Sequence, residues 1–174
     1  MKALLIIDVQ KAMIECENPV YRSTQVIENI HTLVNSARLS KTPIIYVQHN
    51  EENTEFQNGS KSWEIVENVK PEVSDTIIQK TYLDAFKETN LKDILVQKKI
   101  NELIIVGMQS DFCVNATSLR AVEIGYPVTI VSDAHSTFDE EISAKDIIQN
   151  YHEKWSSIIT LKTTNEVCLY DINQ

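Results

Sequence analysis

Short, unbroken apolar runs that end on a polar residue or a glycine recur along this chain of 174 residues. The clearest are residues 3–7, which end on Asp8, and residues 103–106, which end on Gly107. Such runs are typical of strands that are buried on both faces, as in a parallel sheet. Four further stretches have a similar character and lie at residues 44–47, 76–79, 128–131 and 157–161.

Helical patterns separate these predicted strands. In the longest of them, apolar side chains recur at spacings of three and four residues: Val26, Ile30, Leu33, Val34 and Ala37. Regular alternation of strands and helices predicts an α/β fold, in which helices cover both faces of a mostly parallel sheet. The length is that of one domain, which we expect to span residues 1–174.

Composition excludes several classes of function. The net charge of −9 argues against a nucleic-acid partner, because phosphate binding requires concentrated Lys and Arg. No apolar run is long enough to span a membrane, and the beginning of the chain has the pattern of a strand rather than of a signal peptide. With only three glycines, the chain contains neither a GxGxxG turn nor a P-loop.

The cysteines indicate the compartment. Cys16, Cys113 and Cys168 are odd in number and far apart, and none has a partner at zinc-ligand spacing. This pattern predicts free thiols in a reducing cytoplasm.

Three of the predicted strand ends carry side chains with complementary chemistry, namely Asp8, Lys80 and Cys113. Cys113 lies where a strand leads into a helical pattern, with Ser110 and Asp111 as candidate caps, and amides at a helix N-terminus lower the pKa of a thiol. A cation nearby would favour the thiolate, and a carboxylate could accept and return a proton. Each residue also has an ordinary interpretation: a turn-capping Asp, a solvated Lys and a buried, inert Cys.

The chain resembles the isochorismatase-like cysteine hydrolases, a superfamily that includes nicotinamidases. The resemblance covers nearly the whole length and rests on several motifs in the family's order. They are Leu5-Ile6-Ile7-Asp8-Val9-Gln10, Lys80 with Tyr82 and Ala85-Phe86, Gly107-Met108-Gln109-Ser110-Asp111-Phe112-Cys113-Val114, Gly125-Tyr126 and Val131-Ser132-Asp133-Ala134.

The resemblance implies a site as well as a fold. Asp8, Lys80 and Cys113 match the family's catalytic triad. Met108-Gln109 matches its non-proline cis peptide, and the backbone amides of Gln109 and Cys113 match its oxyanion hole. The implied architecture is a doubly wound fold in three layers, with a six-stranded parallel sheet in the order 3-2-1-4-5-6.

Departures from the family pattern limit the substrate. Nicotinamidases carry an Asp-x-His metal group after the second strand, whereas this chain reads Gln48-His49-Asn50. We therefore expect no metal and no other cofactor, and no nicotinamidase activity. The expected pocket residues are Met13, His49, Phe86 and Phe112, together with the loop from Glu51 to Trp63.

The leading hypothesis is a metal-independent hydrolase that cleaves a small amide or a related C–N bond through a thioester on Cys113. Lys80 and the helix N-terminus would favour the thiolate. One alternative is an isochorismatase-type hydrolase of another small metabolite, which the cysteine makes weaker, and another is a non-catalytic module that binds a small molecule. The family also suggests a homo-oligomer, a dimer or larger.

Overall fold

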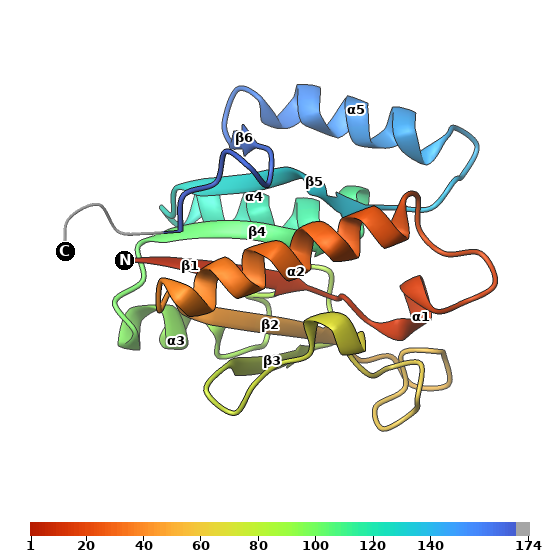
Figure 1. The fold of residues 1–174 in the computed structure, drawn as a ribbon, viewed down its shortest axis with the longest axis horizontal. Coiled ribbons are helices and arrows are strands. Elements are labelled where there is room, and N and C mark those ends of the chain that lie inside the picture. The colour runs from red at the N-terminus through yellow and green to blue at the C-terminus, as the bar shows by residue number, and fades with distance from the viewer. Residues whose placement is uncertain (170–174) are drawn as a thin grey trace.

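The computed structural model describes residues 1–169, so residues 170–174 of the expected domain lie outside the described part. Its core is a six-stranded parallel sheet in the order β3-β2-β1-β4-β5-β6 (Figure 1), which confirms the predicted architecture. The strands are β1 (Lys2–Ile7), β2 (Ile44–His49), β3 (Thr76–Lys80), β4 (Glu102–Met108), β5 (Val128–Ser136) and β6 (Thr160–Lys162).

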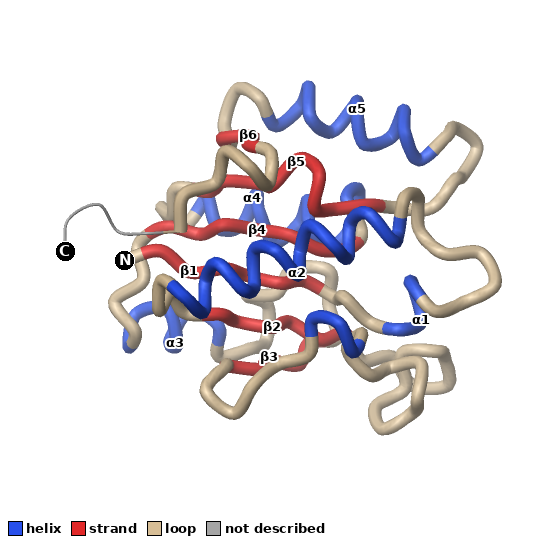
Figure 2. Tube along the Cα trace, viewed as in Figure 1, coloured by secondary structure: helices blue, strands red, loops and turns tan. Residues whose placement is uncertain are grey.

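Helices cover both faces of this sheet (Figure 2). They are α1 (Lys11–Ile14), α2 (Ser23–Leu39), α3 (Leu91–Gln97), α4 (Asn115–Glu123) and α5 (Ala144–Trp155), with a 3-10 turn η1 (Glu67–Val69) and a π-helical turn η2 (Ser110–Val114). Residues 61–66, which precede η1, form turns and an isolated bridge.

Alternating side chains of β1 supply the two halves of the core. Leu4 and Ile6 pack against α2 on one face, whereas Leu5 and Ile7 belong to the cluster on the other face. In Figure 1, α2 lies in front of the sheet, and α3 and α4 lie behind it. Because both faces are covered, the central strands are apolar throughout, as the unbroken runs predicted.

Gly107 allows β4 to approach β1 closely. Its φ is +120°, and a Cβ at this position would lie 2.0 Å from the carbonyl oxygen of Ile7. Only glycine fits such a position. The close approach brings together the two strands that lead to Asp8 and to Cys113.

Among residues 1–169, no helix has both the length and the apolar character needed to cross a membrane.

Candidate active site

The carboxyl ends of the central strands hold the three residues predicted to carry the chemistry. Asp8 directly follows β1 and has a left-handed backbone with φ 50°, which Asp tolerates better than most residues. Lys80 is the last residue of β3, and Cys113 lies in η2, directly after β4. All three are almost fully buried, with 1%, 2% and 8% of their surfaces exposed.

Lys80 holds the group together. Its ammonium Nζ lies 2.7 Å from Asp8 Oδ2, 3.2 Å from Cys113 Sγ and 3.2 Å from His49 Nδ1. An ammonium has three hydrogens to donate, and these three acceptors match them. Burial lowers the pKa of Lys80, but Asp8 and Cys113 outweigh it, and the net pKa is raised. Lys80 is therefore a charged, buried residue, and its ordinary interpretation as a solvated lysine is wrong.

The electrostatics of Cys113 differ from the prediction. Burial, followed by the Asp8 carboxylate, raises the pKa of the thiol to about 12, although Lys80 acts to lower it. Lys80 thus favours the thiolate, as expected, but burial and the Asp8 carboxylate penalise the second negative charge more, and the net pKa of the thiol is raised. At neutral pH Cys113 is a thiol.

Asp8 has an oxygen ready to accept that proton. Within residues 1–169, Asp8 Oδ1 is one of the few buried side-chain oxygens with no hydrogen-bond partner. A buried acceptor without a partner is costly and usually marks a functional site. Because Lys80 occupies Oδ2 and donates to the sulfur, Oδ1 is the oxygen left for the thiol hydrogen.

Gln10 positions His49 beside this group. The side chain of Gln10 accepts from the amide of His49 at 2.8 Å and donates to its carbonyl at 3.1 Å. Burial, followed by the charge of Lys80, lowers the pKa of His49, so that its imidazole is neutral at pH 7. Since Nδ1 accepts from Lys80, the ring hydrogen is on Nε2, 3.8 Å from Glu51 Oε2.

The turn before Cys113 is held in place by side chains from other elements. The Met108–Gln109 peptide bond is cis, and the amides of Phe112 and Val114 both donate to the carbonyl of Gln109. Neither predicted cap forms. Instead, Ser110 bonds to His135 at 2.8 Å, and Asp111 accepts from Thr137 at 2.6 Å, because both side chains turn toward β5.

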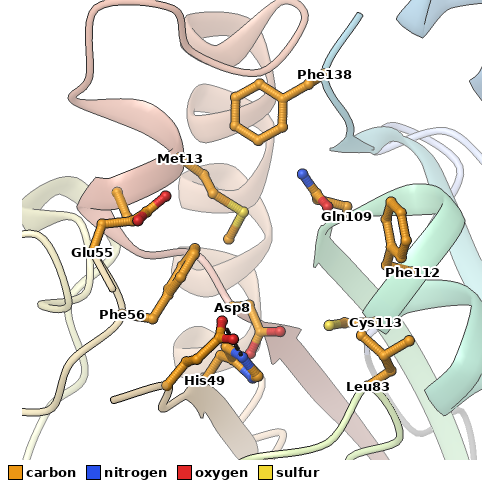
Figure 3. Close-up of a pocket in the computed structure, with 12 residues that line it drawn as sticks. Asp8, Met13, His49, Glu55, Phe56, Leu83, Gln109, Phe112, Cys113 and Phe138 are labelled. Atoms are coloured by element: carbon orange, nitrogen blue, oxygen red, sulfur yellow. Dashed lines mark ion pairs between the residues drawn. The ribbon is translucent and has the colours of Figure 1, made fainter. Parts of the chain in front are cut away.

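A cavity of about 260 Å³ opens onto Asp8 and Cys113. Met13, His49 and Phe112 line it, whereas Phe86 does not: Phe86 packs on the far side of the core and stacks on Tyr126. Figure 3 shows Met13, Glu55 and Phe56 across the cavity from Cys113, Phe112 and Leu83. The remaining lining residues are Ala12, Glu51, Gln109 and Phe138.

Sequence reasoning missed Leu83 and Phe138 as lining residues. Phe138 lies just beyond the end of β5, and Leu83 follows β3, so both come from loops whose path the strand pattern does not determine. The loop that contains Glu51, Glu55 and Phe56 was expected at the mouth of the site, but the individual residues were not identified. Within residues 1–169, no cluster of three His, Cys, Asp or Glu side chains is arranged to hold a metal ion.

The fold and the site define a doubly wound α/β protein with a cysteine at the switch point of its sheet. Residues 2–162 match the model of the Isochorismatase domain. The chain therefore belongs to the isochorismatase family.

Individual relatives agree with this assignment. The uncharacterized isochorismatase family protein YddQ of Bacillus subtilis is 30% identical and covers 93% of this chain and 96% of its own. A streptothricin hydrolase of Streptomyces noursei is 29% identical over 80% of this chain and 51% of its own, so this chain spans about half of that relative's length. A crystal structure of an isochorismatase family protein superimposes with a TM-score of 0.87, at 34% identity, over 93% of this chain and 98% of the other.

Proposed function

We propose that this protein hydrolyses a small carboxamide, or a molecule with a related C–N bond, through a thioester on Cys113. The observation that carries the proposal is the arrangement around Lys80. Its Nζ lies 2.7 Å from an Asp8 oxygen and 3.2 Å from the Cys113 sulfur, and the second Asp8 oxygen has no partner among the described residues. A nucleophile, a proton acceptor and a fixed cation are thus in direct contact.

The first half of the reaction forms the thioester. The thiol proton moves to Asp8 as the sulfur attacks the amide carbonyl, so that free thiolate does not accumulate. The backbone amides of Gln109 and Cys113 donate to the oxyanion of the tetrahedral intermediate. Asp8 then gives its proton to the nitrogen as the C–N bond breaks, and ammonia or an amine leaves.

The second half hydrolyses the thioester. Asp8 removes a proton from a water molecule, whose oxygen adds to the thioester carbonyl. The C–S bond breaks, the carboxylic acid leaves, and the proton on Asp8 returns to sulfur. Lys80 stays charged throughout and stabilises Asp8 whenever that carboxylate is ionised. The sum is one amide and one water converted to one acid and one amine.

The proposal also covers the domain organisation, the metal requirement, the location and the oligomeric state of the protein. It acts as a single domain. It needs no metal, because the end of β2 and the residue after it are Gln48, His49 and Asn50 rather than an Asp-x-His group. It works in the cytoplasm as a homo-oligomer, as the family resemblance and the odd number and wide spacing of the cysteines suggest.

The test is ammonia release from a panel of small primary amides, combined with intact mass spectrometry after an acid quench. Wild type should release ammonia, resist EDTA, and show an acyl adduct that hydroxylamine removes. Cys113→Ala and Asp8→Asn should each lower kcat/KM by at least about a thousandfold. Cys16→Ser is the matched control, because Cys16 is exposed and does not line the cavity, and it should behave as wild type.

Two results would decide against the proposal. Turnover that survives in Cys113→Ala would exclude the thioester and favour hydrolysis of another kind. Binding of amides without any turnover, and with no adduct, would leave the non-catalytic binding module.

A further inference from the structure

The wall of the catalytic cavity is aromatic on several sides. Phe56, Phe112 and Phe138 all line it, and Met13 and Leu83 add apolar surface. Figure 3 shows Phe56 and Met13 opposite Cys113, with Phe138 at one end. Aromatic faces bind apolar groups, but they also attract organic cations through the ring quadrupole.

The charges that line the same cavity are all negative. Asp8, Glu51 and Glu55 contribute carboxylates, and no Lys or Arg belongs to the lining. Asp8 is balanced by Lys80, which lies behind it at 2.7 Å. His49 supplies no balancing charge, because burial lowers the pKa of its imidazole. Among residues 1–169, two exposed carboxylates, Glu51 and Glu55, therefore line the cavity without a counter-charge.

Within residues 1–169, neither carboxylate is paired with a charged cation. Glu51 Oε2 lies 3.8 Å from Nε2 of His49, and burial lowers the pKa of that imidazole, so it is neutral at pH 7. Within residues 1–169, no hydrogen bond or ion pair involves the carboxylate of Glu55. Lys61 shares a separate surface hollow with Glu55 and does not line the catalytic cavity.

We propose that the substrate carries a cationic group, an ammonium or a guanidinium, at the end opposite its scissile amide. This inference rests on the proposed function, because the amide carbonyl must lie at Cys113. From there the molecule extends across the cavity to Phe56 and Glu55, with Glu51 beside its path. The volume of about 260 Å³ restricts it to a small molecule. The net charge of −9 also draws cations toward the protein.

The test uses two amides of equal shape. δ-Aminovaleramide carries an ammonium where hexanamide carries a methyl group, and the two molecules otherwise match. Wild type should show a kcat/KM for δ-aminovaleramide that is about tenfold or more above the value for hexanamide. In the double variant Glu51→Gln/Glu55→Gln this ratio should fall to about one, because glutamine keeps the shape and removes the charge.

A double variant with the same change of net charge serves as the control. Glu17 and Glu52 are exposed and do not line the cavity, so Glu17→Gln/Glu52→Gln should keep the wild-type ratio. If the control lowers the ratio as much as Glu51→Gln/Glu55→Gln does, the preference comes from the net charge, and the assignment of the cavity carboxylates is wrong.

Calorimetry on Cys113→Ala separates binding from turnover. This variant should bind δ-aminovaleramide at least about tenfold more tightly than hexanamide, and the preference should disappear when both cavity carboxylates are also changed to glutamine. Equal binding, no detectable binding of either amide, or a preference for hexanamide would overturn the inference. Turnover of hexanamide with an adduct on Cys113 would then leave the proposed hydrolysis standing. A cation preference in binding without turnover of either amide would overturn the hydrolysis, and with it the inference about a substrate, and would assign the cavity to a cationic ligand.

Discussion

Lys80 donates all three of its ammonium hydrogens within the site, to Asp8, Cys113 and His49. Since one hydrogen points at sulfur, the thiol hydrogen of Cys113 must point elsewhere, and Asp8 Oδ1 is the buried acceptor available. In the proposed reaction, the proton therefore stays on sulfur until the substrate carbonyl is bound, and it moves to Asp8 as the sulfur attacks.

The rate of alkylation of Cys113 tests whether Asp8 keeps its thiol protonated. Because the Asp8 carboxylate raises the pKa of Cys113, Asp8→Asn should lower this pKa and increase the thiolate fraction at neutral pH. The rate of modification by iodoacetamide should then rise by about tenfold or more, while ammonia release is lost. Mass spectrometry of peptides reports the rate, with Cys16 and Cys168 as internal references.

Lys80→Met should have the opposite effect on the same rate, because Lys80 acts to lower the pKa of the thiol. A slower reaction of Cys113 in Asp8→Asn than in wild type would contradict this account of the resting site. It would mean that Asp8 promotes the thiolate instead of opposing it.

At the scale of elements, the contact between β1 and β4 sets the spacing of the site. The two strands pair in register from Lys2–Glu102 to Ile7–Gly107, and they lead to Asp8 and, through η2, to Cys113, the residues proposed to carry the chemistry. Gly107 is the point of closest approach, since a Cβ there would lie 2.0 Å from the carbonyl oxygen of Ile7. Backbone atoms cannot move aside as a flexible side chain can.

Gly107→Ala should therefore reduce the free energy of unfolding by more than about 3 kcal/mol, from the clash together with the positive φ. Gly59→Ala is the matched control: Gly59 also has a positive φ, of +84°, but nothing lies within 4 Å of an added Cβ. It should cost only about 1 to 2 kcal/mol. Urea denaturation measures both values, and equal losses would show that the approach of the strands is not limiting.

At the scale of the whole molecule, a pair of histidines, His135 buried and His152 half-buried, links three elements. His135 on β5 bonds to Ser110 of η2 at 2.8 Å and to His152 of α5 at 2.9 Å, and it lies edge-on to Trp155. Burial, followed by His152, lowers the pKa of His135 from 6.5 to about 3. Burial also lowers the pKa of His152.

This pair should make the fold sensitive to acid. In the folded protein His135 stays neutral down to about pH 3, whereas in the unfolded chain it takes up a proton below about pH 6.5. The free energy of unfolding is therefore highest above about pH 6.5, and it decreases as the pH falls from there toward 3. Between about pH 7.5 and about pH 5, His135 should cost about 2 kcal/mol. Urea denaturation at the two pH values gives the free energy of unfolding of wild type and of His135→Gln. The loss between the two pH values should be larger in wild type by this amount.

His31→Gln is the control for the acid experiment, because His31 is exposed and should leave the pH dependence unchanged. If wild type and His135→Gln lose the same stability on acidification, the buried histidine is not what limits the fold in acid.

Much of the architecture could be predicted from the sequence by itself. Unbroken apolar runs that alternate with helical patterns predicted a parallel sheet covered on both faces, and the family resemblance implied its six strands and their order. The motifs around Asp8, Lys80 and Cys113 indicated the family and the candidate residues, because those residues stand at strand ends. All of this information is local: it concerns which residues follow which.

Only the tertiary structure decided how these side chains act on each other. Lys80 is the end of an ordinary, half-exposed strand, and nothing in its neighbours along the chain shows that its ammonium is buried against Asp8. Distances and loop paths likewise decide the protonation state of Cys113. They also decide that Glu55 and Phe138 line the cavity whereas Phe86 does not. The interaction between charged groups depends on their distance and on their burial, and the order of residues along the chain specifies neither directly.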